Sequence, residues 1–290
     1  MKGQVTKLCD AASIQIPAEM LTVSVDKEQV ENEVRQLSMS YAKQEQVPGV
    51  CCGDIVTCKD AQGAYADGRS VMLYTGLNIP GGQDAAKAAI GKQVGDTFAT
   101  TLADKPVSLT VEKVIRLTPA QVNDGLIASL NIPDVTTVDA YRQYAENMLK
   151  DRQAGEKRKM AVGYVMEKTL EASEFAYDQT EMDAYFAAHM DEIMAEYKEF
   201  GMEGTEEDIR HDVLQQFKQG WLAEEMCKRN GYELDMAEVE QETDQMLEMM
   251  SLMGETAPDR ETLVEESIRN AYVMEMFKQL ETVVDGKMGG

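Results

Sequence analysis

Hydrophobic and polar positions divide the chain into three parts. In the first part, apolar residues recur at the spacing of a helix over residues 24–42, and Ser24 or Asp26 precedes them as an N-cap. Residues 7–16 lack that period and predict an extended segment. One face of the predicted helix would carry Val30, Val34, Leu37 and Tyr41.

Residues 46–118 change to short alternating runs separated by glycine turns. A single short helix is predicted among them, at residues 85–90. Strands are predicted at residues 53–59, 71–76, 98–103 and 107–117. A twisted antiparallel sheet wrapped on one short helix is the natural packing for these pieces.

From Pro119 onward the pattern is almost wholly helical, and glycines and prolines mark the breaks. The helices are predicted at residues 120–130, 136–172, 178–200, 205–230, 235–252 and 259–284. The second of these would be about 50 Å long at 1.5 Å per residue, and helices of that length act as arms or form a bundle. The pattern therefore predicts an α+β protein, with a small antiparallel β-domain inserted in an extended helical domain with arms.

Charge is concentrated in the last part of the chain. The net charge is −24, and residues 171–290 carry 31 acidic and 9 basic side chains, a net of −22. Such a surface repels phosphate backbones, so nucleic acid is not expected as a partner. No stretch approaches the eighteen or so apolar residues that cross a bilayer, so no membrane is expected either.

The N-terminus and the cysteines favour a cytoplasmic protein. The first twenty residues contain no continuous apolar core, so they do not resemble a signal peptide. The cysteines number five, and Cys51 and Cys52 are adjacent, which is a poor disulfide framework and indicates reduced thiols. Neither a CxxC spacing nor a nearby histidine accompanies them, so no metal site is expected. Cys58 is predicted to pack as a small hydrophobic residue in a strand.

The order of these segments resembles the trigger factor family, over roughly residues 8–285. The most specific match is NIPGGQDAAKAAIGKQVGD at residues 78–96, which is similar to the family's turn and short helix in its FKBP-like domain. Weaker matches are KLCDAASIQIP, VSVDKEQVENEVRQL, VCCGDIVTCK, LTPAQVNDGLIASLN and GYELDMAEVEQETDQMLEMM. The resemblance implies a linker strand and helix at 1–45, an FKBP-like domain at 46–118 and a helical chaperone domain at 119–290. The family's N-terminal ribosome-binding domain has no counterpart here, so docking at the ribosome is not expected.

The resemblance places a prolyl isomerase pocket in the FKBP-like domain, but most of its aromatic positions differ. Such a pocket holds a prolyl peptide against aromatic rings, which supply most of its contact area. Ile79 matches a pocket residue, whereas Gly82 stands where the family has its aromatic floor and Leu109 replaces another aromatic residue. Tyr74 is a candidate for rebuilding part of the wall. We therefore expect a degenerate pocket and assign no catalytic residue.

Methionines concentrate in the helical part, where 15 of the 20 lie between Met160 and Met288. Methionine is flexible and is over-used on promiscuous binding surfaces. The candidate client-binding residues are Met246, Met249, Met250 and Met253. The alternative is ordinary core filling. Trp221 is expected to be a core anchor, and the two histidines, His189 and His211, lack the partners of a catalytic triad.

Three functions remain open from the sequence. The first is a chaperone that binds unfolded or nascent polypeptides without ATP, because no nucleotide-binding motif or other cofactor site is present. The second is an active FKBP-type prolyl isomerase. The third is a scaffold that holds one specific folded partner. The sequence also leaves open whether the protein is a dimer.

Overall fold

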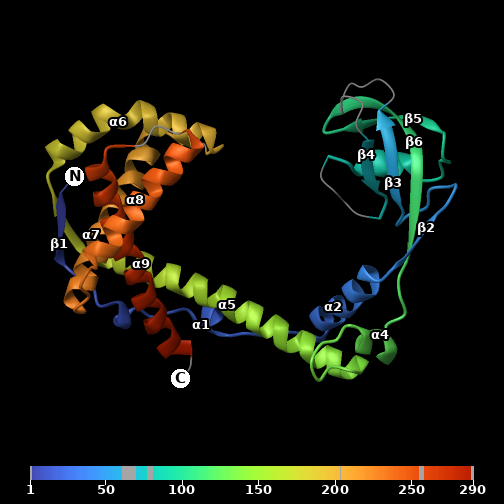
Figure 1. The fold of residues 1–290 in the computed structure, drawn as a ribbon, viewed down its shortest axis with the longest axis horizontal. Coiled ribbons are helices and arrows are strands. Elements are labelled where there is room, and N and C mark those ends of the chain that lie inside the picture. Colours follow the sequence, from blue (N-terminus) through green and yellow to red (C-terminus); the bar gives the residue numbers. More distant parts are fainter. Residues whose placement is uncertain (1, 61–69, 77–80, 203, 255–257, 289–290) are drawn as a thin grey trace. The chain divides into compact units, whose positions relative to one another are not determined.

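The computed structural model describes residues 2–60, 70–76, 81–202, 204–254 and 258–288. The chain forms two compact units (Figure 1). The first, here called the helical unit, combines Met1–Val23 with Arg152–Gly290, and the second, the sheet unit, is Ser24–Asp151. Within the described ranges, no helix is both long and apolar enough to cross a membrane.

The sheet unit is built on an antiparallel sheet. Its strands are β2 (Lys43–Gln46), β3 (Ile55–Asp60), β4 (Ser70–Tyr74), β5 (Thr97–Leu102) and β6 (Lys105–Thr118). The long strand β6 organises the sheet, because β2, β3 and β5 all pair with it, and β4 pairs with β3. The short helix α3 (Gln83–Ala89) buries its alanines against the apolar face of the sheet, in one core with Val56, Leu73 and Leu109.

Three helical segments complete the sheet unit. Helix α2 (Lys27–Ser40) begins with a capping box, in which the Asp26 side chain accepts from the backbone N–H of Gln29 and the Gln29 side chain accepts from that of Asp26. Helix α4 (Asp124–Ser129) and the first turns of α5 (Val138–Ala172) pack with it around the buried Ile127. The apolar spacing that predicted α2 places Val30 and Val34 in this second core.

The helical unit contains the rest of α5, α6 (Gln179–Glu199), α7 (Glu206–Arg229), α8 (Met236–Met253) and α9 (Arg260–Met288). Its N-terminal segment adds the strand β1 (Gly3–Lys7), the 3-10 turn η1 (Ala11–Ser13) and the short helix α1 (Ala18–Leu21). Strand β1 pairs antiparallel with β7 (Glu174–Tyr177). One core joins α5, α7 and α9, and a second lies between α6 and α7.

The α+β fold class is confirmed, and most helices lie within a few residues of the predicted ranges. The extended segment expected at residues 7–16 is wrong in detail, because the strand is Gly3–Lys7 and a 3-10 turn follows it. Strand β2 was not predicted because its four residues are polar and exposed, and β7 was not predicted because its four residues occupy a short gap between two helices. The division into domains at residues 45 and 118 stays a prediction.

Candidate functional site

The residues assigned to the remnant isomerase pocket lie on different sides of the sheet. Leu109 is fully buried in the core face, where it pairs across the strands with Phe98 and Asp60. Tyr74 is half-buried and alternates with the buried Leu73, so it points to the opposite face. Its hydroxyl donates to the sulfur of Met72 over 3.1 Å. Gly82 is the N-cap of α3, and Ile79 lies outside the described residues.

This arrangement limits what the four residues can do together. Helix α3 packs on the same face of the sheet as Leu109, so Gly82 and Leu109 belong to one side. Tyr74 cannot share a pocket with them because the sheet separates it from that face. The Leu109 side chain fills core volume, and whether the domain catalyses prolyl isomerisation stays an open prediction.

The methionines assigned to client binding lie at the end of α8. Only Val239 and Thr243 are buried in this helix, and the Thr243 hydroxyl donates to that of Ser267 in α9 over 3.0 Å. Helix α8 therefore contacts α9 at Thr243. In the second half, Met246, Met249 and Met253 are 38%, 56% and 65% exposed, and Met250 is half-buried.

Leu252, which the sequence analysis did not select, is the most exposed apolar residue of this segment, at 82%. The residues Met246, Met249 and Met253 follow one another at spacings of three and four, so they form a stripe on one side of the helix. We call Met246, Met249, Leu252 and Met253 the α8 patch. The patch therefore contains three of the four predicted methionines and adds Leu252.

A second site lies between α6, α7 and α9, and its centre is a cluster of aromatic rings around Trp221. The indole ring lies 5.8 Å from the ring of Tyr177, 6.2 Å from Phe217 and 6.5 Å from Phe175, measured between ring centroids. Tyr185 of α6 extends this cluster, with its ring 5.2 Å from that of Phe217. Trp221 is 9% exposed, so the expectation of a core anchor agrees with its burial.

Two adjoining cavities open beside these rings. One, of about 380 Å³, lies between α7, α9 and the start of β1, and the other, of about 210 Å³, lies between α6, α7 and α9. They share Phe217 and Arg269, and the Arg269 guanidinium lies 5.9 Å from the centre of the Phe217 ring. We call the two together the aromatic cleft. Its apolar lining consists of Tyr185, Ile193, Tyr197, Val213, Phe217, Trp221, Ile268 and Tyr272.

The polar lining of the cleft carries charges of both signs. Glu196, Glu224 and Glu265 line it, against Arg269 and Lys2. Burial raises the pKa of Tyr185, and the nearby Arg269 opposes that shift. The Tyr185 hydroxyl therefore stays protonated at neutral pH. The cleft offers ring faces and tyrosine hydroxyl groups beside glutamate and arginine side chains.

Sequence reasoning missed the aromatic cleft because its rings come from helices far apart in the chain. The one local signal was the spacing of Phe217 and Trp221, which are four residues apart and therefore on the same face of α7. The sequence offers no indication that Tyr185 and Tyr272 meet that face.

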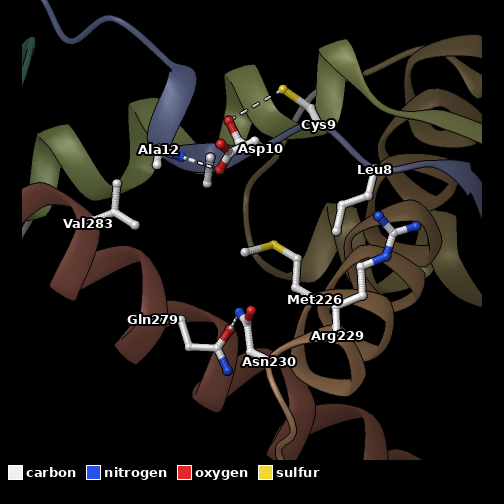
Figure 2. A pocket seen from close by; sticks show the side chains of 10 residues that line it. Leu8, Cys9, Asp10, Ala12, Met226, Arg229, Asn230, Gln279 and Val283 are labelled. Atoms are coloured by element: carbon white, nitrogen blue, oxygen red, sulfur yellow. Dashed lines mark hydrogen bonds between the residues drawn. The ribbon is translucent and has the colours of Figure 1, made fainter.

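A third cavity, of about 360 Å³, lies where the N-terminal segment meets α7 and α9 (Figure 2). Three of the polar side chains that line it form hydrogen bonds or ion pairs with nearby residues. Asp10 accepts from the backbone N–H of Ala12 over 2.9 Å, and Asn230 donates to Gln279 over 2.6 Å. Arg229 pairs with Glu225 over 2.6 Å. This cavity joins the N-terminal segment to the helices, and we assign it no ligand.

The cysteines differ in their expected reactivity. Cys58 is fully buried in β3, as predicted, and Cys227 is fully buried in α7, whereas Cys51 and Cys52 are exposed. Burial raises the pKa of Cys58 and of Cys227 to about 11, so both remain thiols at pH 8.

Iodoacetamide at pH 8 should therefore modify Cys51 and Cys52 in the folded protein, and Cys58 and Cys227 only after unfolding. Peptide mapping by mass spectrometry, with and without denaturant, measures the rate at each position. Labelling of Cys58 as fast as that of Cys51 in the folded protein would contradict its burial in β3.

The comparisons with known proteins support the fold. The sequence matches no model of a known protein family and no curated protein. The structure is similar to a solved trigger factor chaperone, described by its promiscuous substrate recognition in folding and assembly activities. The two share 18% sequence identity with a TM-score of 0.55, over 98% of this chain and 73% of the other. The chain therefore has a trigger-factor-like fold.

Proposed function

We propose that this protein is a molecular chaperone that binds unfolded or nascent polypeptides and assists their folding without ATP. The α8 patch is the observation that carries the proposal. Four large apolar side chains are exposed within two turns of a helix whose buried residues, Val239 and Thr243, lie in its first half. A contiguous exposed apolar surface of this kind marks an interaction site.

The energetics of the patch suit weak binding to many sequences. Full burial of a Leu or Met side chain contributes about 1.5–3 kcal/mol, so partial burial of several gives an affinity that allows release. Methionine adapts its shape to different partners because it is unbranched. The net charge of −22 over residues 171–290 opposes association between copies of the protein. A promiscuous chaperone needs both properties.

The triple variant Met246→Gln, Met249→Gln, Met253→Gln is expected to lose most of the ability to delay client aggregation. Glutamine is close to methionine in size and helix propensity, so the helix is retained while the apolar surface is removed. Light scattering of a chemically denatured client on dilution, without nucleotide, measures the delay.

The matched control carries the same substitution at three methionines of similar exposure elsewhere: Met72, Met160 and Met274, which are 56%, 59% and 62% exposed. The control should delay aggregation as well as the unchanged protein does. If the unchanged protein gives no delay, the proposed function is wrong. If both variants lose activity equally, the α8 patch is not the binding surface.

The range of partners separates a chaperone from a scaffold. A chaperone of the proposed kind should retain many different unfolded proteins, whereas a scaffold retains a single folded protein in a fixed ratio. A proline-limited refolding assay tests the isomerase alternative, for which a rate equal to that of buffer is the expected result.

A further inference from the structure

The two-stranded sheet of the helical unit has open edges. Strand β1 pairs with β7, and within the described residues neither strand has a second strand as partner. In an antiparallel pair, alternate residues direct their N–H and C=O groups to the partner, and the others direct them away. Figure 1 draws β1 along the outer margin of the helical unit. Its outer edge is therefore a template for another strand.

One face of β1 is held against the aromatic cleft. Gly3 and Val5 are half-buried and face inward, whereas Gln4 is exposed. A side chain at Gly3 would overlap the Trp221 ring, so the backbone of β1 lies directly on the indole. The packing keeps the strand in place when its outer edge is unpaired.

The larger cavity of the aromatic cleft adjoins the same strand. Lys2 and Gly3 line it on one side, and Phe217, Trp221, Ile268 and Tyr272 supply its apolar walls. Lys2 and Gly3 also line a shallow hollow that continues over Gln4, Ala176 and Tyr177. In the described residues, the edge of β1 that pairs with no strand therefore lies next to a cavity with apolar and charged walls.

We propose that an extended segment of an unfolded polypeptide adds to the outer edge of β1 as a third strand and places an apolar side chain in the cavity between α7 and α9. The proposal rests on the proposed function and specifies how one client segment is held. Main-chain hydrogen bonds to β1 are independent of the client's sequence, and the cavity accepts one apolar side chain. A helical segment cannot occupy this site because its backbone groups are already paired.

The test uses a capped eight-residue peptide in which leucine and threonine alternate between terminal lysines. Two N-methylated versions are compared, one methylated at two odd-numbered amides and one at two even-numbered amides. In an added strand, only one of these sets faces β1. One version should therefore bind about tenfold more weakly than the unmethylated peptide, and the other within about twofold of it. Equal affinities for the two versions would overturn the proposal.

Two further measurements locate the site. Hydrogen exchange should slow in residues 2–7 when the unmethylated peptide binds. Ile268→Ser, in the cavity wall, should weaken binding about fivefold. Val264→Ser, at a half-buried position one turn earlier on α9 and outside that wall, should weaken it less than twofold.

The outcomes separate this inference from the proposed function. If the peptide binds without a difference between the methylated versions, and aggregation is still delayed through the α8 patch, the added strand is wrong and the chaperone function stands. If no client is retained at all, both fail. Dimerisation through β1 in the absence of peptide would also overturn the proposal, because a second copy would then occupy the edge.

Discussion

Gly3→Ala is expected to destabilise the helical unit by about 2–3 kcal/mol and to shift the fluorescence of Trp221. A Cβ atom at Gly3 would lie 2.4–2.5 Å from three atoms of the indole ring, which is far inside van der Waals contact. The ring cannot move aside freely because Phe217, Tyr177 and Phe175 surround it. Overpacking of this kind costs about 1–3 kcal/mol. Denaturant titration of the fluorescence of Trp221, the only tryptophan in the sequence, measures the change.

Gly155→Ala is the matched control for this prediction. Gly155 lies within α5, and a Cβ atom there would meet nothing within 4 Å. Alanine is favoured over glycine inside a helix, so the same substitution should stabilise the protein by about 0.5–1 kcal/mol. Effects of opposite sign at the two positions are the expected result. A Gly3→Ala protein as stable as the unchanged protein would show that β1 does not lie on Trp221.

Asp54→Asn is expected to destabilise the sheet unit by about 3 kcal/mol. Asp54 is 2% exposed and accepts two hydrogen bonds from Arg116, at 3.0 Å from Nε and 2.8 Å from Nη2. It also accepts from the backbone N–H of Cys51 over 2.7 Å. Removing one charge of a buried ion pair lowers stability, because the opposite charge is left in the protein without a partner charge. The side chain of Arg116 is 39% exposed, so the expected loss of stability is at the low end of the range for breaking a buried ion pair.

The same pair predicts a dependence on pH. The hydrogen bond from Arg116 lowers the pKa of Asp54 below its ordinary value. The stabilisation is therefore complete above the pKa of an unfolded aspartate, about 4, and is lost as the pH falls through the lower pKa of the folded state. Hydrogen exchange at the amides of Val56 and Val114 should report less protection in Asp54→Asn, with the difference from the unchanged protein narrowing at low pH.

Glu146→Gln is the control for this pair. Glu146 forms an exposed ion pair with Lys150 one turn along α5, and such pairs contribute about 0.3–0.5 kcal/mol. The substitution should leave the exchange at Val56 and Val114 nearly unchanged. Equal effects of the two substitutions would contradict the assignment of the Asp54–Arg116 pair as the stronger contact.

Local patterns were sufficient to predict most of the elements. The helical spacing of Val30 and Val34 placed α2, and the alternation in residues 107–117 placed most of β6. Local patterns were insufficient where the face on which a side chain lies depends on how two strands pair. The two faces of the sheet follow from strand register, and β3 shifts register against β6 between Thr57 and Cys58. No local pattern predicts that shift, so a shared pocket for Tyr74 and Leu109 could not be judged from the sequence.

The α8 patch and the aromatic cleft also differ in how far local sequence patterns could predict them. Three residues of the α8 patch were selected because the methionines of 246–253 are close in sequence, and the adjacent Met249 and Met250 cannot both point inward. The aromatic cleft was missed because Tyr185, Phe217 and Tyr272 meet only through the packing of α6, α7 and α9. The contact between Gly3 and Trp221 joins residues more than two hundred positions apart, which periodicity cannot reveal.

The central claim is that the α8 patch contacts unfolded clients, and methionine-methyl NMR tests it most directly. With ¹³C-labelled methionine methyl groups, a permanently unfolded client should shift and broaden the signals of Met246, Met249 and Met253. The buried Met182 and Met276, which are 2% and 0% exposed, and the exposed Met72 should stay unchanged. Unchanged signals from the α8 patch at a client concentration that prevents aggregation would contradict the account.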